Sequence, residues 1–147
     1  MKKLLIGMVL LCSLLYSDGF DDYLKNFDYK AIKEMKIRTV EMLNMVEDGR
    51  AQVIDIRFPD EYEAWHMGFA KNIPINELPD RLSELDKNKL IITACPHNDR
   101  ANIARMFLMF KGYRVKYLSD GLLSTTDYLK GSNAQEFMDE YKKDEAK

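Results

Sequence analysis

The most constraining feature of the sequence is a cysteine placed between a short apolar segment and a longer amphipathic one. Residues 90–94 are apolar apart from one threonine, and this pattern predicts a buried strand. Beyond residue 100, apolar side chains recur at three- and four-residue spacing: Ile103, Met106, Phe107 and Phe110. This spacing predicts a helix that ends near Gly112. Residues 95–100 must then form a tight loop between the strand and the helix.

This loop has the composition of an anion-binding site. A loop that opens a helix directs backbone N–H groups toward its mouth, where they attract negative charge. Cys95 faces that field, so we expect its thiolate to be favoured. Arg100 follows five residues later and is expected to close the loop as a bidentate clamp for an anionic group. The alternative is that Cys95 is a small buried hydrophobic residue with no chemical role.

Length and composition bound the possible classes of protein. The chain has 147 residues, 46% of them hydrophobic, which fits one compact domain with a sizeable core. Its formal net charge of -2 argues against nucleic-acid binding, which needs a basic face. No glycine pattern for phosphates or dinucleotides is present, and His97 is too close to Cys95 for a zinc site. We therefore expect no metal and no cofactor.

The amino-terminal residues have the pattern of a secretory signal. Lys2 and Lys3 precede an apolar run at residues 4–15, which is too short to span a membrane as a helix, and Ser17 follows. We predict a signal peptide at residues 1–17 and a single domain at residues 18–147, with its core at about 38–131. The expected location is periplasmic or secreted. An uncleaved anchor, or a lipoprotein attached through Cys12, is the alternative.

Cleavage after Ser17 would leave Cys95 as the only cysteine of the mature chain. No internal disulfide could then form. An odd thiol in an exported protein indicates either a reactive group or a partner for an intermolecular bond. Removal of two lysines would also leave 20 basic and 24 acidic residues, a net charge of -4.

Predicted strands and helices alternate along the chain, which indicates an α/β fold with a mostly parallel sheet covered on both faces. In such sheets ligands bind at the carboxyl ends of the strands, where Cys95 falls. A second strand is predicted at residues 52–56 and contains Asp55. A buried acid is costly unless it is paired, so Asp55 is expected at the strand end or beside a cation, and Arg57 follows directly. Thr39 is predicted to be the N-cap residue of the preceding helix.

A succession of short motifs extends over residues 39–131 and resembles the single-domain rhodanese family. The motifs are Val53–Arg57, Glu61–Tyr62, His66, Ala70–Pro74, Leu90–Cys95, Arg100, Gly112–Val115 and Gly121. The resemblance implies a five-stranded sheet with helices on both faces. It implies that Cys95 carries a persulfide sulfur cradled by loop amides, and that Asp55 with Arg57 supports the loop.

The sequence departs from the family pattern within the expected substrate-binding residues, which are Pro96, His97, Asn98, Asp99 and Arg100. Asn98 stands where glycine is frequent, and asparagine tolerates the left-handed backbone better than most residues. Pro96 has no N–H to donate, and Asp99 adds a negative charge at the mouth. Thr125 occupies the position of a frequent tryptophan. We still expect the rhodanese fold, but these departures should weaken the binding of a dianion such as thiosulfate.

The leading prediction is an exported sulfurtransferase that moves a sulfane sulfur from thiosulfate or polysulfide, through Cys95, to cyanide, sulfide or a thiol. Its expected partner is a small sulfur-containing anion, and a thiol protein as acceptor and a homodimer are left open. One alternative is a sulfur carrier or binding module without turnover. Another is a cysteine-dependent phosphatase or arsenate reductase, but their loops place five residues between cysteine and arginine, whereas four lie between Cys95 and Arg100.

Overall fold

The computed structural model describes residues 19–145 and divides the chain into two compact units, residues 1–33 and 34–147. In the first unit residues 19–25 are helical, and α2 (Tyr29–Glu34) begins there. The predicted signal peptide and Cys12 lie outside the described residues, so the cleavage site and the full extent of the domain stay predictions. Among residues 19–145, no helix is both long enough and apolar enough to cross a membrane.

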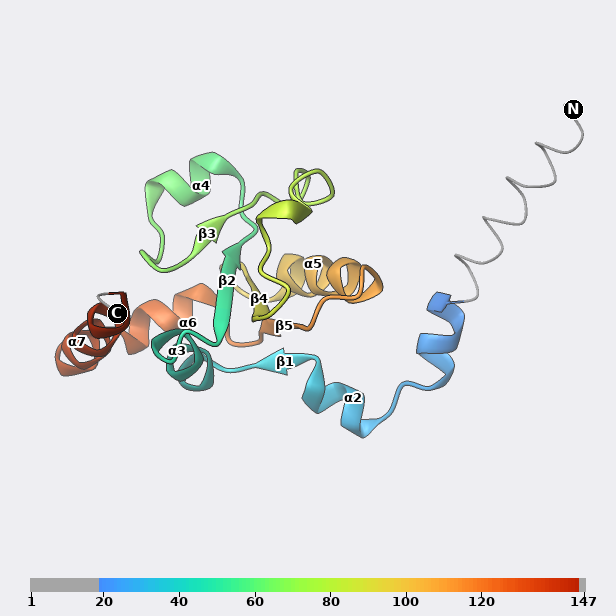
Figure 1. The fold of residues 1–147 in the computed structure, drawn as a ribbon, viewed down its shortest axis with the longest axis horizontal. Helices are drawn as coiled ribbons and strands as arrows, with labels where there is room; N and C mark the ends of the chain where they lie inside the picture. Colours follow the sequence, from blue (N-terminus) through green and yellow to red (C-terminus); the bar gives the residue numbers. More distant parts are fainter. Residues whose placement is uncertain (1–18, 146–147) are drawn as a thin grey trace, which may run out of the picture. The chain divides into compact units, whose positions relative to one another are not determined.

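The second unit is built on a parallel sheet of five strands within its described residues. The strand order is β1-β5-β4-β2-β3, so β4 lies at the centre (Figure 1). The strands are β1 (Lys36–Ile37), β2 (Ala51–Asp55), β3 (Lys71–Asn72), β4 (Leu90–Ala94) and β5 (Val115–Leu118). Parallel neighbours require long crossovers, which the helices supply. The predicted α/β fold with its five-stranded parallel sheet is therefore confirmed.

Helices cover both faces of this sheet. The connecting elements are α3 (Thr39–Glu47), α4 (Pro59–Ala64), the 3₁₀ turn η1 (Leu82–Glu84), α5 (Asp99–Phe110), α6 (Gly121–Tyr128) and α7 (Ser132–Glu145). Because successive strand residues point to opposite faces, β2 contributes Val53 to one core and Ile54 to the other. The first core includes residues of α3, α6 and α7, and the second includes residues of α5.

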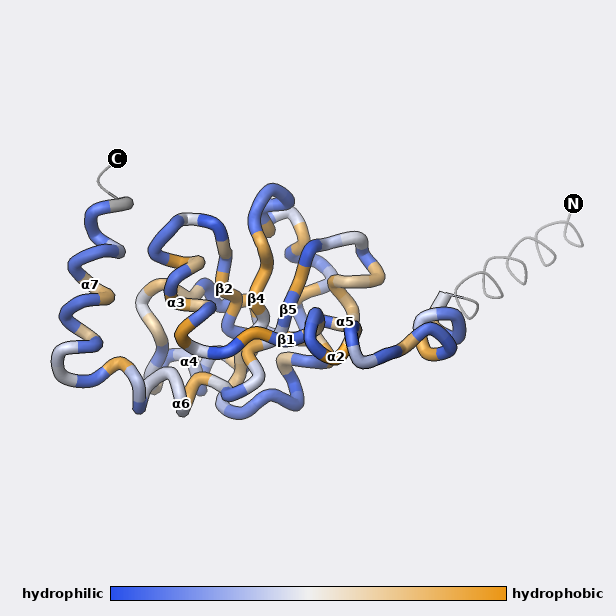
Figure 2. Tube along the Cα trace, turned by 90° about the horizontal axis from the view of Figure 1, so that it is seen from below, coloured by the Kyte–Doolittle hydropathy of each residue, from blue (hydrophilic) through white to orange (hydrophobic). Residues whose placement is uncertain are grey.

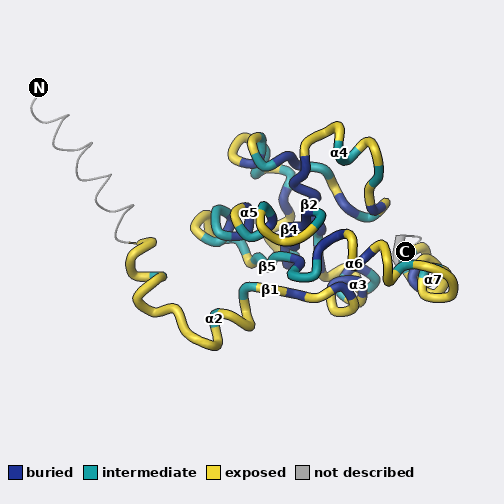
Figure 3. Tube along the Cα trace, turned by 180° about the vertical axis from the view of Figure 1, so that it is seen from behind, coloured by how far each residue is buried: buried dark blue, intermediate teal, exposed yellow. Residues whose placement is uncertain are grey.

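The burial pattern agrees with this layering. Hydrophobic residues concentrate along β2 and β4, and polar residues dominate the outer helix α7 (Figure 2). The same two strands are buried along most of their length, whereas most of α7 is exposed (Figure 3). Strands enclosed on both faces read as nearly continuous apolar runs, which is why residues 90–94 were recognisable from the sequence.

Helix α5 departs from its predicted geometry in two respects. It begins at Asp99, so Asp99 and Arg100 belong to its first turn and the loop contains only residues 95–98. Its buried face includes two alanines and Leu108, whereas Ile103 is 62% exposed. Small side chains let the helix backbone lie close to β4, so alanines rather than the larger apolar residues face the sheet. The helix ends as predicted, with Gly112 at a φ of 82°.

The start of α3 is held by residues distant in sequence rather than by its own cap. Arg38 is the N-cap residue, not Thr39 as predicted, and it makes no side-chain capping bond. Asp120 instead accepts the Thr39 N–H through both carboxylate oxygens, at 3.1 and 3.2 Å. The buried hydroxyls of Thr39 and Thr125 lie 3.0 Å apart and share a hydrogen bond. These contacts connect α3 to the first turns of α6, which in turn contacts the Cys95 loop.

Candidate active site

Cys95 follows the central strand β4 at the carboxyl edge of the sheet. Its side chain is fully buried and packs in the second core with Ile54, Ile56 and Ala101. The adjoining strand end is fixed, because the Ile56 N–H donates to the Ala94 carbonyl at 3.0 Å. The sequence therefore placed Cys95 correctly at the strand end, but the thiol is covered rather than open to solvent.

The first turn of α6 determines which way the loop backbone faces. The N–H groups of Leu122 and Leu123 donate to the carbonyls of Cys95 and Pro96, at 3.0 and 3.3 Å. Because these two carbonyls accept from α6, the N–H groups of the loop and of the first turn of α5 are left to interact with the sulfur. The N–H groups of His97 and Ala101 hydrogen-bond to Cys95 and favour its thiolate. One amide of the loop and one of α5 thus act on the sulfur, and the cradling of a persulfide by them stays a prediction.

Gly121 makes this close contact between α6 and the loop possible. Its φ is 74°, a backbone conformation that side chains disfavour. A β-carbon here would also lie 2.8 Å from the His97 α-carbon, and closer still to the carbonyl oxygens of Pro96 and His97. Only glycine fits at this position without displacing the loop.

The electrostatic balance at the sulfur differs from the expectation. Burial is the largest influence and raises the pKa of the Cys95 thiol, and the charge of Asp99 raises it further. The two amide hydrogen bonds and the charge of Arg100 act in the opposite direction but do not compensate. The prediction that the loop favours the thiolate is wrong for this conformation, because desolvation outweighs the positive field of the amides.

Arg100 does not clamp the sulfur directly. Its two terminal nitrogens donate to the carboxylate oxygens of Glu61 on α4, at 2.7 and 2.9 Å. The side chain that does contact the sulfur is that of Asp99, whose Oδ1 accepts from the thiol at 3.7 Å. Sequence reasoning assigned no function to Glu61. The sequence shows only that Glu61 is a carboxylate two residues after Pro59 in a short predicted helix. That position does not indicate Arg100 as its partner.

The remaining loop residues are more exposed. Pro96 is half-buried, and His97 and Asn98 are exposed. Asn98 does not use the left-handed backbone for which we expected it to be suited, since its φ is -156°. Its side-chain amide instead donates to the Ser119 carbonyl at 3.0 Å. Asn98 therefore ties the loop to the turn before α6 through a hydrogen bond rather than through backbone conformation.

Asp55 and Arg57 form a fully buried ion pair. An Arg57 nitrogen lies 2.6 Å from Asp55 Oδ2, and both side chains are at most 1% exposed. Arg57 also donates to the Trp65 carbonyl at 2.7 Å and stacks on the Trp65 ring at 4.1 Å. The pair thus braces the connection that carries α4 and Glu61. That this ion pair supports the Cys95 loop stays a prediction. The support would act through the connection to α4 and through the backbone of β2.

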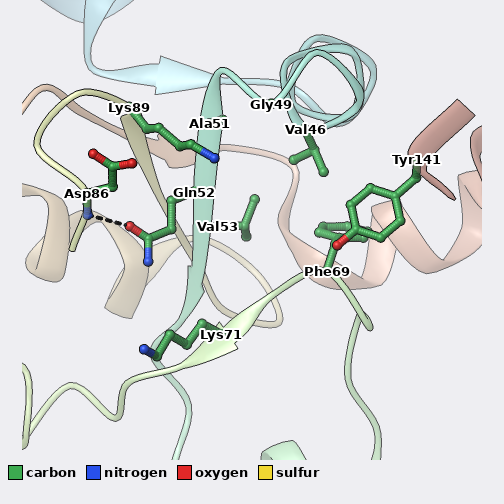
Figure 4. A pocket seen from close by; sticks show the side chains of 10 residues that line it. All are labelled: Val46, Gly49, Ala51, Gln52, Val53, Phe69, Lys71, Asp86, Lys89 and Tyr141. Atoms are coloured by element: carbon green, nitrogen blue, oxygen red, sulfur yellow. Dashed lines mark hydrogen bonds between the residues drawn. The ribbon is translucent and has the colours of Figure 1, made fainter. Parts of the chain in front are cut away.

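A pocket of about 500 Å³ lies elsewhere on the domain. In Figure 4, Phe69 and Tyr141 stand on one side of it, and Lys71, Lys89 and Asp86 on the other. Ala51 lines this pocket and pairs with Leu90 where β2 and β4 begin, whereas Cys95 follows their far ends. The pocket and the thiol are therefore at opposite ends of the sheet. Among residues 19–145 no cluster of histidine, cysteine and acidic side chains could hold a metal ion.

Comparison with known proteins identifies the family. The family described as Rhodanese-like domain matches residues 39–126, which include α3, strands β2 to β5 and most of α6. The chain therefore belongs to the rhodanese-like domain family. At the level of the family, this membership supports a sulfur-transfer role.

Two curated relatives illustrate the sequence likeness. The HTH-type transcriptional regulator Rv0324 of Mycobacterium tuberculosis is 38% identical over 96 residues, which cover 61% of this chain and 41% of the relative. The tRNA sulfurtransferase of Vibrio cholerae is 28% identical over 82 residues, 53% of this chain and 17% of that enzyme. The chain thus spans less than half the length of both relatives, which contain regions that it does not match.

Solved structures share the fold. Bacillus anthracis CoADR-RHD matches at 36% identity and a TM-score of 0.56, covering 59% of this chain and 15% of that one. The BH2092 protein from Bacillus halodurans matches at 25% identity and a TM-score of 0.60, covering 76% and 80%. A rhodanese-related protein from Thermoplasma volcanium matches at 25% identity and a TM-score of 0.57, covering 63% and 90%.

Proposed function

We propose that this protein is an exported sulfurtransferase that carries a sulfane sulfur as a persulfide on Cys95. The observation that carries the proposal is the position of the Cys95 sulfur, which lies at the carboxyl edge of the sheet within the amides of His97 and Ala101. Membership of the rhodanese-like family supports it, as does the likeness to a protein named as a tRNA sulfurtransferase.

The proposed reaction has two steps. The Cys95 thiolate attacks the sulfane sulfur of thiosulfate or a polysulfide, the donor's S–S bond breaks, and sulfite or the shortened polysulfide leaves. The new S–S bond holds a terminal sulfur on Cys95. Cyanide, sulfide or a thiol, including the thiol of a protein acceptor, then attacks that terminal sulfur and releases the Cys95 thiolate. Backbone amides stabilise the anionic sulfur in both steps.

Turnover tests the proposal. Purified protein is incubated with thiosulfate or polysulfide and with cyanide or a thiol acceptor, and the product is measured over many enzyme equivalents. We expect sustained turnover that Cys95→Ser abolishes. Equal turnover by Cys95→Ser would exclude Cys95 as the carrier of the sulfur.

A second candidate function is that of a sulfur carrier or docking module without turnover of small molecules. The full burial of Cys95 and the raised pKa of its thiol favour this candidate, because both slow the reaction with dissolved donors. It predicts a Cys95 persulfide that small acceptors leave intact and that only a partner protein discharges.

Export and assembly belong to the same proposal. The basic and apolar pattern of residues 1–17 supports a cleaved signal and a periplasmic or secreted location. Mass spectrometry of the protein recovered from its source would show a mature chain that begins near Asp18 and therefore lacks Cys12. Light scattering of the same material would show whether a homodimer forms.

A further inference from the structure

The side chain of Glu61 occupies the place where an anionic substrate would meet Arg100. Both terminal nitrogens of Arg100 already donate to the Glu61 carboxylate, at 2.7 and 2.9 Å. The same carboxylate accepts the Phe58 N–H at 3.2 Å, which fixes it at the start of α4. The bidentate fork that the two terminal nitrogens would offer to a sulfonate or sulfate group is therefore filled by a side chain of the protein itself.

The charge of Asp99 opposes the thiolate of Cys95, and the charge of Arg100 favours it. The Asp99 carboxylate lies 3.7 Å from the Cys95 sulfur. The pKa of Asp99 is lowered chiefly by a hydrogen bond from the backbone N–H of Arg100. The hydrogen bonds from Arg100 likewise lower the pKa of Glu61. Both carboxylates are therefore ionised at neutral pH. The side chains of the site supply two negative charges and the one positive charge of Arg100.

We propose that Glu61 and Asp99 make Cys95 selective for an organic persulfide donor over dianionic thiosulfate. This inference rests on the proposed sulfur-transfer function and names its donor class. Thiosulfate would bring two negative charges close to the carboxylates of Asp99 and Glu61, and the terminal nitrogens of Arg100 are already paired with Glu61. A persulfide R–S–SH is neutral when its outer sulfur is attacked and needs no guanidinium for recognition.

The chemistry balances without any further reactant. The Cys95 thiolate attacks the outer sulfur of R–S–SH, and a new S–S bond forms to Cys95. The S–S bond of the donor breaks, its electron pair leaves with the inner sulfur as the thiolate RS⁻, and the proton stays on the transferred sulfur. One negative charge is present before and after the step, and it leaves the crowded mouth with RS⁻.

A purely structural role for the Glu61–Arg100 pair predicts different kinetics. The two side chains are 36% and 30% exposed, and ion pairs at such exposure contribute little to stability. If the pair only positioned α4 against α5, loss of the Glu61 charge would affect both kinds of donor alike. A role in selectivity predicts that the two donors respond differently.

The test measures the rate of sulfur loading on Cys95 by intact-protein mass spectrometry. The donors are thiosulfate and mercaptoethanol persulfide, and the proteins are wild type, Glu61→Gln and the matched control Glu63→Gln, an exposed carboxyl on the same helix. We expect wild type to load at least about tenfold faster from the persulfide. Glu61→Gln should accelerate loading from thiosulfate about tenfold and leave persulfide loading nearly unchanged, while Glu63→Gln changes neither.

Each other outcome overturns the inference. Faster loading of wild type from thiosulfate, or an equal effect of Glu61→Gln on both donors, contradicts the selectivity and leaves the sulfur-transfer function standing. Loading from neither donor removes the proposed function and the inference together. Unchanged persulfide loading in Glu61→Gln also shows that this variant is folded.

Discussion

At the scale of single residues, Cys95 is under opposing influences whose balance decides its reactivity. Burial and the charge of Asp99 stabilise the thiol, while two backbone amides and Arg100 stabilise the thiolate. Because the pKa is raised above its ordinary value, the thiol predominates at neutral pH. Sulfur loading should therefore accelerate as pH rises toward that pKa, since only the thiolate attacks sulfur.

Asp99→Asn tests this balance. The substitution keeps the shape of the side chain and removes the negative charge 3.7 Å from the sulfur, so the pKa of Cys95 should fall. The pKa is measured by titration of the thiolate's ultraviolet absorbance against Cys95→Ser as the blank. Asp60→Asn, an exposed position at the start of α4, is the control and should leave the titration unchanged. An unaltered or higher pKa in Asp99→Asn would contradict the account of the charge.

Gly121→Ala tests the contact between α6 and the loop. The added methyl group meets the backbone of Pro96 and His97, so unfolding should require about 1–3 kcal/mol less than in the control. The control is Gly112→Ala, because Gly112 also has a positive φ but open space where its β-carbon would lie. Denaturant unfolding measures both, and sulfur loading should fall only in Gly121→Ala. Equal stability of the two variants would show that the methyl group added at residue 121 does not disturb the packing of α6 against the loop.

At the scale of the elements, local patterns located the helices and strands but not the contacts between them. The apolar run of β4 and the helical spacing after residue 100 were predictable because burial on both faces and helical periodicity leave local signatures. The contacts of Thr39 with Asp120 and Thr125 span more than 80 residues and leave no such signature. The same holds for Glu61 and Arg100, which are 39 residues apart.

The site shows the same division between local and non-local information. The positions of Cys95 and its amide loop followed from the sequence pattern. The raised thiol pKa did not, because desolvation depends on how the second core, which includes Ala101 and Ile56, packs in three dimensions. The buried face of α5 was also unpredictable from hydrophobicity alone, since two alanines are buried there while the more hydrophobic Ile103 is exposed.

Asp55→Ala tests the buried ion pair with Arg57, which braces the connection to α4 and Glu61. Removal of the carboxylate leaves the guanidinium of Arg57 buried without its partner, which should destabilise the domain by about 3–5 kcal/mol. Asp48→Ala removes one partner of the exposed pair with Arg50 and should cause little change. Chemical denaturation of both variants gives the comparison. A small effect of Asp55→Ala would mean that water or another group replaces the lost carboxylate.

At the scale of the whole molecule, the excess of acidic residues acts in the same direction as the local charges. The chain has a net charge of -2, so a dianionic donor is repelled at a distance as well as at the mouth. This repulsion is screened by salt over a Debye length of about 8–10 Å at physiological ionic strength.

Ionic strength therefore provides a further prediction. Added sodium chloride should increase the rate of sulfur loading from thiosulfate and have little effect on loading from mercaptoethanol persulfide. The rates are measured at constant pH and several salt concentrations. A rate with thiosulfate that falls as salt increases would indicate that the mouth attracts anions, contrary to the charges of Glu61 and Asp99.

The central claim is that the loop after β4 holds one transferable sulfur on Cys95. The most direct measurement is intact-protein mass spectrometry after incubation with mercaptoethanol persulfide, followed by peptide mapping and treatment with excess thiol. We predict one added sulfur atom, located on Cys95, absent from Cys95→Ser and lost on treatment with thiol. A protein that gains no sulfur, or gains it at a site other than Cys95, would contradict the account.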